Sequence, residues 1–120
     1  MKILIASALF FIAPMGAQAA CTAADFSIQN FQPELSSGSI GRRVTLKGDL
    51  VNHCSEPFAA QIEVVAKDSR GRELVSKKAW PAGTSNIAPG KSVSFDLGRL
   101  FRFRSDMTTF SARIVGVRSW

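Results

Sequence analysis

Hydrophobic and polar residues alternate along several short stretches of this chain, most clearly over residues 44–51. A period of two places successive side chains on opposite faces, as in a β-strand with one buried face. The apolar face consists of Val44, Leu46, Gly48 and Leu50. The residues from Asn52 to Pro57 are mostly of types that favour turns, so the strand is expected to end there.

Five further stretches have strand character, and turn-forming residues separate them. The stretches cover residues 26–31, 60–67, 73–80, 92–97 and 110–117, with turns or loops at 33–41, 68–71 and 81–90. Residues 100–107 fit a crossing loop, a short helix or a ragged strand. No stretch has a sustained helical period. Six to seven short strands predict an all-β fold, an immunoglobulin-like antiparallel β-sandwich.

The alternation also predicts which residues form the core between the sheets. The expected core residues are Leu46, Leu50, Ile62, Val64, Phe95, Phe110 and Ile114. Gly48 weakens the middle of its strand, so we expect either a large neighbour packed against it or a bulge. The side chain of Asn52 is expected to bond nearby backbone and hold the turn.

The first twenty residues have the pattern of a secretory signal peptide. Lys2 is followed by an apolar run from Ile3 to Met15, and Ala17-Gln18-Ala19 is a small-residue cleavage signal. Cleavage near Ala19 or Ala20 would leave a single domain, residues 21–120, in the periplasm or outside the cell. No second apolar run of spanning length follows, so no transmembrane segment is expected after cleavage. The alternative is an uncleaved N-terminal anchor.

Cys21 and Cys54 form an even pair in a small exported chain, and this predicts a disulfide bond between them. The alternative is that Cys21, directly after the signal peptide, is the lipidated residue of a lipoprotein. Lipoprotein signals usually have Leu three places before the cysteine, and this chain has Gln18 there.

Three segments, taken in order, resemble a known family. They are Leu46-Lys47-Gly48-Asp49-Leu50-Val51-Asn52, then Ala66-Lys67-Asp68-Ser69-Arg70-Gly71, then Ile87-Ala88-Pro89-Gly90 leading into Val93-Ser94-Phe95. Together they resemble the bacterial FxLYD domain, a small immunoglobulin-like sandwich of exported and lipid-anchored proteins, over about residues 40–117. The resemblance implies a fold and an exported location. It implies no enzymatic activity and no defined ligand.

The chain is basic, with 15 Lys and Arg against nine Asp and Glu. Only Lys2 falls within the signal peptide, so removing that peptide leaves a net charge of +5. A basic surface favours anionic partners such as lipid head groups, lipopolysaccharide or an acidic polymer, although it can also be an ordinary solvated surface.

The candidate contact for such a partner is the segment Arg99-Leu100-Phe101-Arg102-Phe103-Arg104. Three arginines alternate loosely with two phenylalanines, as in basic-aromatic surfaces that bind anions. In the alternative interpretation, Phe101 and Phe103 close the end of the core while Arg99, Arg102 and Arg104 are simply solvated.

No residue set in the sequence indicates catalysis, a metal or a cofactor. His53, the single histidine, has no ligand-spaced partners and is interpreted as a turn residue. The sequence therefore predicts a non-catalytic module of the cell envelope that binds an envelope protein or an anionic envelope component. The alternative is an accessory or inhibitor domain that acts through a loop on another exported protein. Nucleic acid is not expected as a partner of an exported protein, and the sequence indicates no oligomeric state.

Overall fold

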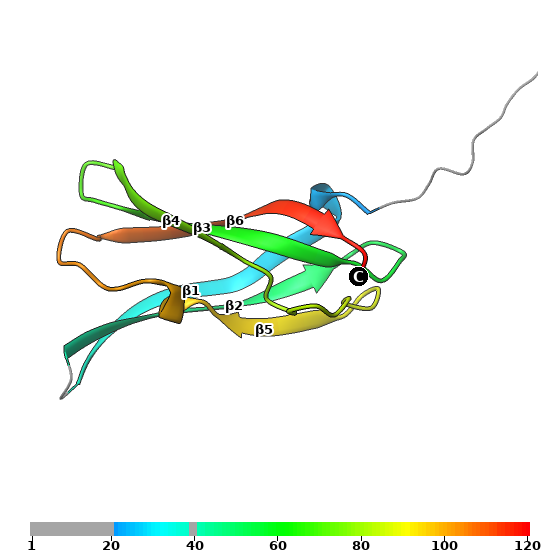
Figure 1. The fold of residues 1–120 in the computed structure, drawn as a ribbon, viewed down its shortest axis with the longest axis horizontal. Coiled ribbons are helices and arrows are strands. Elements are labelled where there is room, and N and C mark those ends of the chain that lie inside the picture. Colours follow the sequence, from blue (N-terminus) through cyan, green and yellow to red (C-terminus); the bar gives the residue numbers. More distant parts are fainter. Residues whose placement is uncertain (1–20, 39–40) are drawn as a thin grey trace, which may run out of the picture.

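The computed structural model describes residues 21–38 and 41–120. Six strands form two antiparallel sheets of three strands each, which pack face to face (Figure 1). The strands are β1 (Phe26–Gly38), β2 (Gly41–Asn52), β3 (Ala59–Lys67), β4 (Glu73–Ala79), β5 (Ser92–Asp96) and β6 (Thr109–Arg118). The sheet orders are β1-β2-β5 and β4-β3-β6. The predicted all-β sandwich of six to seven strands is confirmed, while the predicted signal peptide, residues 1–20, lies outside the described residues.

β1 is longer than the sequence predicts, and the loop predicted at 33–41 is wrong for residues 33–38 and 41, while residues 39–40 lie outside the described residues. The strand continues to Gly38 and pairs with β2 from Gly41 onward. Residues 33–37 are all exposed, so no alternation of apolar and polar positions identifies them as a strand. Pro33 is tolerated because β1 is an edge strand. The resulting hairpin extends beyond the other strands at one end of the sandwich (Figure 1).

The core lies between the sheets and follows the predicted alternation. Five of the predicted core residues are buried, namely Leu46, Leu50, Ile62, Val64 and Phe95. Phe110 and Ile114 are only half-buried against this core. Both belong to β6, which is an edge strand of its sheet and is therefore covered on one side only.

The neighbour predicted for Gly48 is Phe95. The two residues are register partners on β2 and β5. A Cβ atom on Gly48 would lie 2.7 Å from Cζ of the Phe95 ring, so the ring occupies the space that a side chain would need. The large aromatic group thus compensates for the missing side chain in the middle of the strand.

Asn52 is a fully buried polar residue at the end of β2, and its side chain is fully bonded to backbone. Its Nδ2 group donates to the carbonyl oxygens of Glu56 at 2.9 Å and Ile87 at 2.7 Å. Its Oδ1 atom accepts from the Cys54 N–H at 2.7 Å. The predicted role of Asn52 in holding the turn is confirmed, and the residue also joins this turn to the loop before β5.

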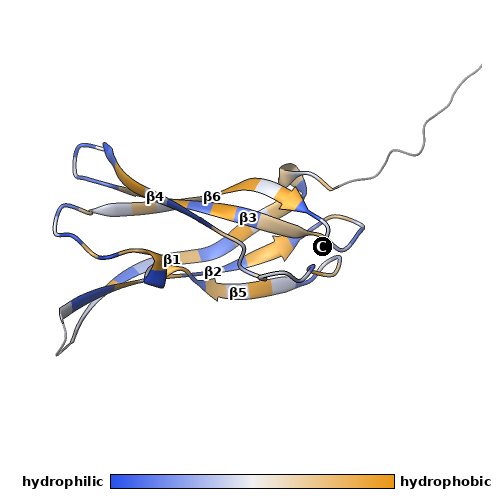
Figure 2. Ribbon diagram, in the orientation of Figure 1, coloured by the Kyte–Doolittle hydropathy of each residue, from blue (hydrophilic) through white to orange (hydrophobic). Residues whose placement is uncertain are grey.

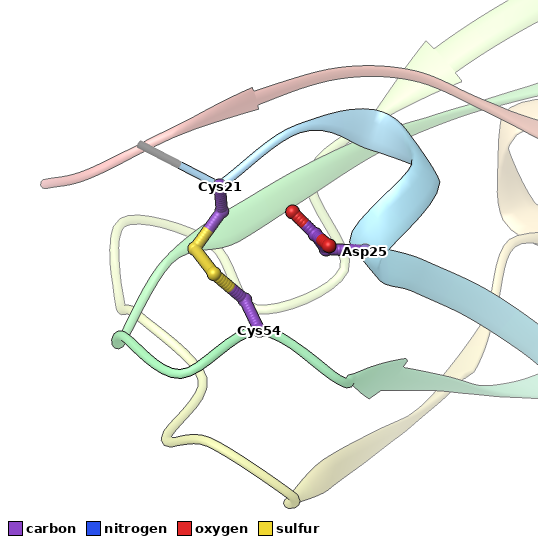
Figure 3. Close-up of side chains that lie close together, drawn as sticks. All are labelled: Cys21, Asp25 and Cys54. Atoms are coloured by element: carbon purple, nitrogen blue, oxygen red, sulfur yellow. A yellow bond between two sulfur atoms is a disulfide. The ribbon is translucent and has the colours of Figure 1, made fainter. Parts of the chain in front are cut away.

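The predicted disulfide between Cys21 and Cys54 is present, with Cα atoms 5.8 Å apart. It fastens the segment before β1 to the turn after β2, at the end of the sandwich opposite the extended hairpin (Figures 1 and 3). Cys21 is buried and belongs to the hydrophobic core, and Cys54 packs against that core.

The described part of the chain contains two single 3-10 turns and no α-helix. They are η2 (Ala23–Asp25) and η3 (Gly98–Leu100). Of the interpretations open for residues 100–107, the crossing loop is correct, because η3 ends at Leu100 and irregular chain leads to β6.

No helix within residues 21–38 and 41–120 has the length and apolar character needed to cross a membrane.

Candidate functional site

A groove forms where β2 is longer than its neighbour β5. β5 ends at Asp96, and its pairing with β2 ends at Lys47, although β2 begins at Gly41. The chain then crosses toward the other sheet through η3, beside the first residues of β2. The two segments enclose a groove of about 830 Å³. Its lining residues are Ser36, Ser37, Gly41, Arg42, Arg43, Val44, Thr45, Asp96, Gly98, Arg99, Phe101, Arg102 and Phe103.

Gly98 determines how closely the crossing segment approaches β2. A Cβ atom at this position would overlap the Val44 carbonyl oxygen and would lie 2.9 Å from the Cα atom of Thr45. Because glycine has no side chain, η3 can lie directly against the β2 backbone, and this sets the position of the basic segment that follows.

Asp96 fixes the same junction through its carboxylate. Its Oδ1 atom accepts from the backbone N–H groups of Leu46 and Gly98, each at 2.9 Å. Partial burial raises the pKa of this carboxyl. The two hydrogen bonds and the nearby cations Lys47 and Arg99 lower the pKa by more than burial raises it, so the net pKa is below its usual value. Asp96 is therefore an anion held in place by the fold.

The groove is strongly basic. Four of its lining residues are arginines, Arg42, Arg43, Arg99 and Arg102, and its lining includes one carboxylate, Asp96. All four arginines are exposed. Figure 2 shows hydrophilic residues along the end of the hairpin and at η3. The arginines of the lining come from two separate segments of the chain, the start of β2 and the segment after β5.

The predicted contact residues divide between the groove and its surroundings. Arg99, Phe101, Arg102 and Phe103 line the groove. Arg104 does not, and its Nη2 atom forms an ion pair with Asp106 Oδ2 at 2.7 Å. The structure thus brings four of the five predicted residues together and gives the fifth a partner of its own.

The two phenylalanines have different roles. Phe101 is buried and packs edge-to-face on Phe110 with ring centroids 5.7 Å apart, so the core-lid interpretation describes this residue. Phe103 is half-buried, and the guanidinium of Arg42 lies 5.9 Å from its ring centroid. This distance is within cation–π range, so Phe103 helps to hold Arg42 at the groove.

Arg42 and Arg43 are groove residues that the sequence interpretation missed. They follow the stretch predicted as a loop and precede the first residue of the clear alternation, Val44. The available signal was the Gly41-Arg42-Arg43 sequence itself, which holds two adjacent cations in a basic chain. Its link to Arg99 and Arg102 depends on tertiary structure.

His53 forms a polar contact that the sequence interpretation did not predict. Its Nε2 atom lies 2.8 Å from Ser27 Oγ. A serine–histidine pair of this kind acts as a nucleophile only when a third group orients the imidazole. No carboxylate in the described part of the chain bonds His53, and neither Ser27 nor His53 lines the groove. We therefore interpret the pair as a surface hydrogen bond.

Cys21, Asp25 and Cys54 lie close together in Figure 3, with their potential ligand atoms within 4.8 Å of one another. The two sulfur atoms are joined in the disulfide and offer no thiolate. Asp25 Oδ2 accepts from the Thr22 backbone N–H at 2.8 Å and caps η2. This cluster therefore has a structural role.

No family model matches the chain, and comparisons with curated proteins and with solved structures gave no match. The function is therefore inferred from the groove.

Proposed function

We propose that this chain is a non-catalytic binding module exported to the bacterial cell envelope, and that it binds an anionic envelope component in the groove. The observation that carries the proposal is that Arg42, Arg43, Arg99 and Arg102, from two separate segments of the chain, all line one groove. Guanidinium groups bind phosphate and carboxylate through paired N–H donors, so phosphorylated or carboxylated groups are the expected ligands.

The charge balance inside the groove supports this ligand class. Asp96 is the carboxylate in the lining, and its Oδ1 atom is already engaged by two backbone N–H groups. None of the ion pairs in the described part of the chain involves the four arginines. Their charge therefore remains available to a ligand.

Export is supported by two observations. The first twenty residues have the signal peptide pattern described above, and the Cys21–Cys54 disulfide suits an oxidising compartment such as the periplasm.

The strand order supports the immunoglobulin-like and FxLYD-like part of the proposal. The first, second and fifth strands share one sheet, and the third, fourth and sixth share the other. In an immunoglobulin domain, strands A, B and E likewise lie opposite strands C and F. The family resemblance is thus compatible with the topology, although it adds no ligand.

The direct test measures binding of short-chain polyphosphate to two variants of equal charge. The groove variant carries Arg42→Ser, Arg43→Ser, Arg99→Ser and Arg102→Ser. The control variant carries Arg70→Ser, Lys77→Ser, Lys78→Ser and Lys91→Ser, which removes four exposed cations outside the groove.

We expect the groove variant to bind polyphosphate at least about tenfold more weakly than the parent, because several exposed ion pairs are lost together. The control variant should retain most of the affinity, and added salt should weaken the parent's binding through screening. Equal losses in both variants would show that net charge alone attracts the ligand, and the proposal would then be wrong.

A further inference from the structure

The groove has a second property that its charge does not explain, which is the open backbone edge of β2 along one wall. Five consecutive residues of β2, Gly41 to Thr45, line the groove, and all of them lie beyond the end of the β2–β5 pairing at Lys47. Antiparallel strands satisfy their N–H and C=O groups through such pairing, so the first part of β2 lacks a partner on this side.

The direction of the unpaired groups follows from neighbouring hydrogen bonds. The carbonyl oxygen of Leu46 accepts from the Leu97 N–H at 3.0 Å, and the N–H of Asn52 donates to the Lys91 carbonyl oxygen at 3.0 Å. The backbone N–H and C=O groups of Leu46 and Asn52 therefore face the β5 side of β2. The N–H and C=O groups of successive residues in a strand point to opposite sides of it, so every second residue faces the same way as Leu46. The N–H and C=O groups of Val44 and Arg42 therefore also face the β5 side.

The crossing segment covers only part of this edge. Gly98 packs against the Val44 carbonyl oxygen. Within the described residues, no main-chain hydrogen bond joins Arg42 to the crossing segment or to β5. The N–H and C=O groups of Arg42 therefore border the groove without a backbone partner.

We propose that the partner in the groove is an extended acidic segment of another envelope protein, which pairs with β2 at Arg42 as an added strand. This inference rests on the proposed function and names its ligand class. Main-chain hydrogen bonds to the open edge would provide affinity, as in other cases of strand addition.

Charge complementarity specifies the side chains of the added strand. Arg42 and Arg43 are adjacent on β2 and so point to opposite faces of the sheet. Arg99 and Arg102 lie on the crossing segment at the other wall. A strand with acidic residues would meet guanidinium groups on both walls, whereas a basic or purely apolar strand would not.

The test uses two variants that lose the same charge but differ in one backbone donor. Arg42→Ser removes the guanidinium and keeps the N–H, while Arg42→Pro removes both. Proline suits this position because the N–H does not face β1 and so makes no existing ladder bond. The probe is the hexapeptide Glu-Thr-Glu-Thr-Glu-Thr, and its control is Glu-Pro-Glu-Pro-Glu-Pro, which has equal charge and fewer N–H donors.

We expect Arg42→Pro to bind the Glu-Thr peptide about fivefold more weakly than Arg42→Ser, the loss expected for one main-chain hydrogen bond. Both variants should bind short-chain polyphosphate equally. In the parent protein, the Glu-Thr peptide should slow hydrogen exchange of the Arg42 amide, and the Glu-Pro peptide should not. This exchange measurement does not depend on how well the proline variant folds.

Equal peptide binding by the two variants, with unchanged exchange at Arg42, would overturn the inference. If polyphosphate or phosphatidylglycerol vesicles bind in the groove and the Glu-Thr peptide does not, strand addition is wrong and the proposed anion-binding function still holds. If none of these probes binds, both fail.

Discussion

Gly98 lies so close to Val44 that any side chain at position 98 would overlap the Val44 carbonyl oxygen. This contact brings the chain leaving β5 directly onto the edge of β2. It explains why the Arg99–Arg102 segment and the start of β2 form one groove although they are far apart in the sequence.

The first prediction is that Gly98→Ala destabilises the protein and weakens polyphosphate binding together. The methyl group would force η3 away from β2, and overpacking of this kind costs about 1–3 kcal/mol in the free energy of unfolding. Urea denaturation and polyphosphate titration would measure the two effects. Gly116→Ala is the matched control, because a Cβ atom there would meet its nearest neighbour at an ordinary 3.8 Å. Similar results for both variants would contradict the importance of the Gly98 contact.

The second prediction concerns Asn52. Replacing it with Ala should lower the free energy of unfolding by at least about 2 kcal/mol, because the buried carbonyl group of Ile87, the carbonyl group of Glu56 and the Cys54 N–H would each lose a partner. Asn52→Asp should also be destabilising, because it keeps the acceptor for Cys54 but removes both donors. A loss below about 1 kcal/mol for Asn52→Ala would mean that other groups or water can replace its bonds.

The third prediction concerns the disulfide. The double variant Cys21→Ser, Cys54→Ser should lose about 3–4 kcal/mol of stability in the chain-entropy treatment, because the bond closes a loop with a sequence separation of 33. Its polyphosphate affinity at a temperature where it is folded should match that of the parent, since the bond lies at the opposite end of β2 from the groove. Mass spectrometry of the non-reduced exported protein should find the linked cysteines, and a diacylated Cys21 would contradict this prediction.

The fourth prediction is a pH dependence that involves Asp96. The pKa of this carboxyl is lower in the folded protein than its unfolded value of about 3.9. The unfolded state therefore takes up the proton first, and the stabilisation is present above about pH 4 and lost as the pH falls through the folded pKa. Urea melts between about pH 5 and pH 2 should show a smaller acid-induced loss for Asp96→Asn than for the parent. If the stability of Asp96→Asn and of the parent falls equally with pH, the Asp96 carboxylate does not contribute to stability in this way.

The parts of the fold that could be predicted are those in which one face of a strand is buried. The alternation from Val44 to Leu50 correctly identified the core face of β2, and the glycine in that face correctly implied a large neighbour, which is Phe95. Asn52 was recognisable because its side chain bonds local backbone, an interaction that depends mainly on nearby residues.

The remaining features depend on how distant segments meet. Residues 33–37 form a strand with both faces exposed, so the sequence pattern there is indistinguishable from that of a loop. Arg42 and Arg43 join Arg99 and Arg102 because β5 is shorter than β2 and Gly98 allows close approach. Neither the relative lengths of paired strands nor this contact is encoded in a local pattern.

The central claim is that Arg42, Arg43, Arg99 and Arg102 form one anion-binding groove. A titration of the isotope-labelled protein with short-chain polyphosphate, followed by amide chemical shifts in ¹H–¹⁵N NMR spectra, tests it most directly. The predicted result is that the largest shift changes fall on residues 41–45 and 96–103, with little change around Cys54. Changes centred on β4, or spread evenly over all basic residues, would contradict the claim.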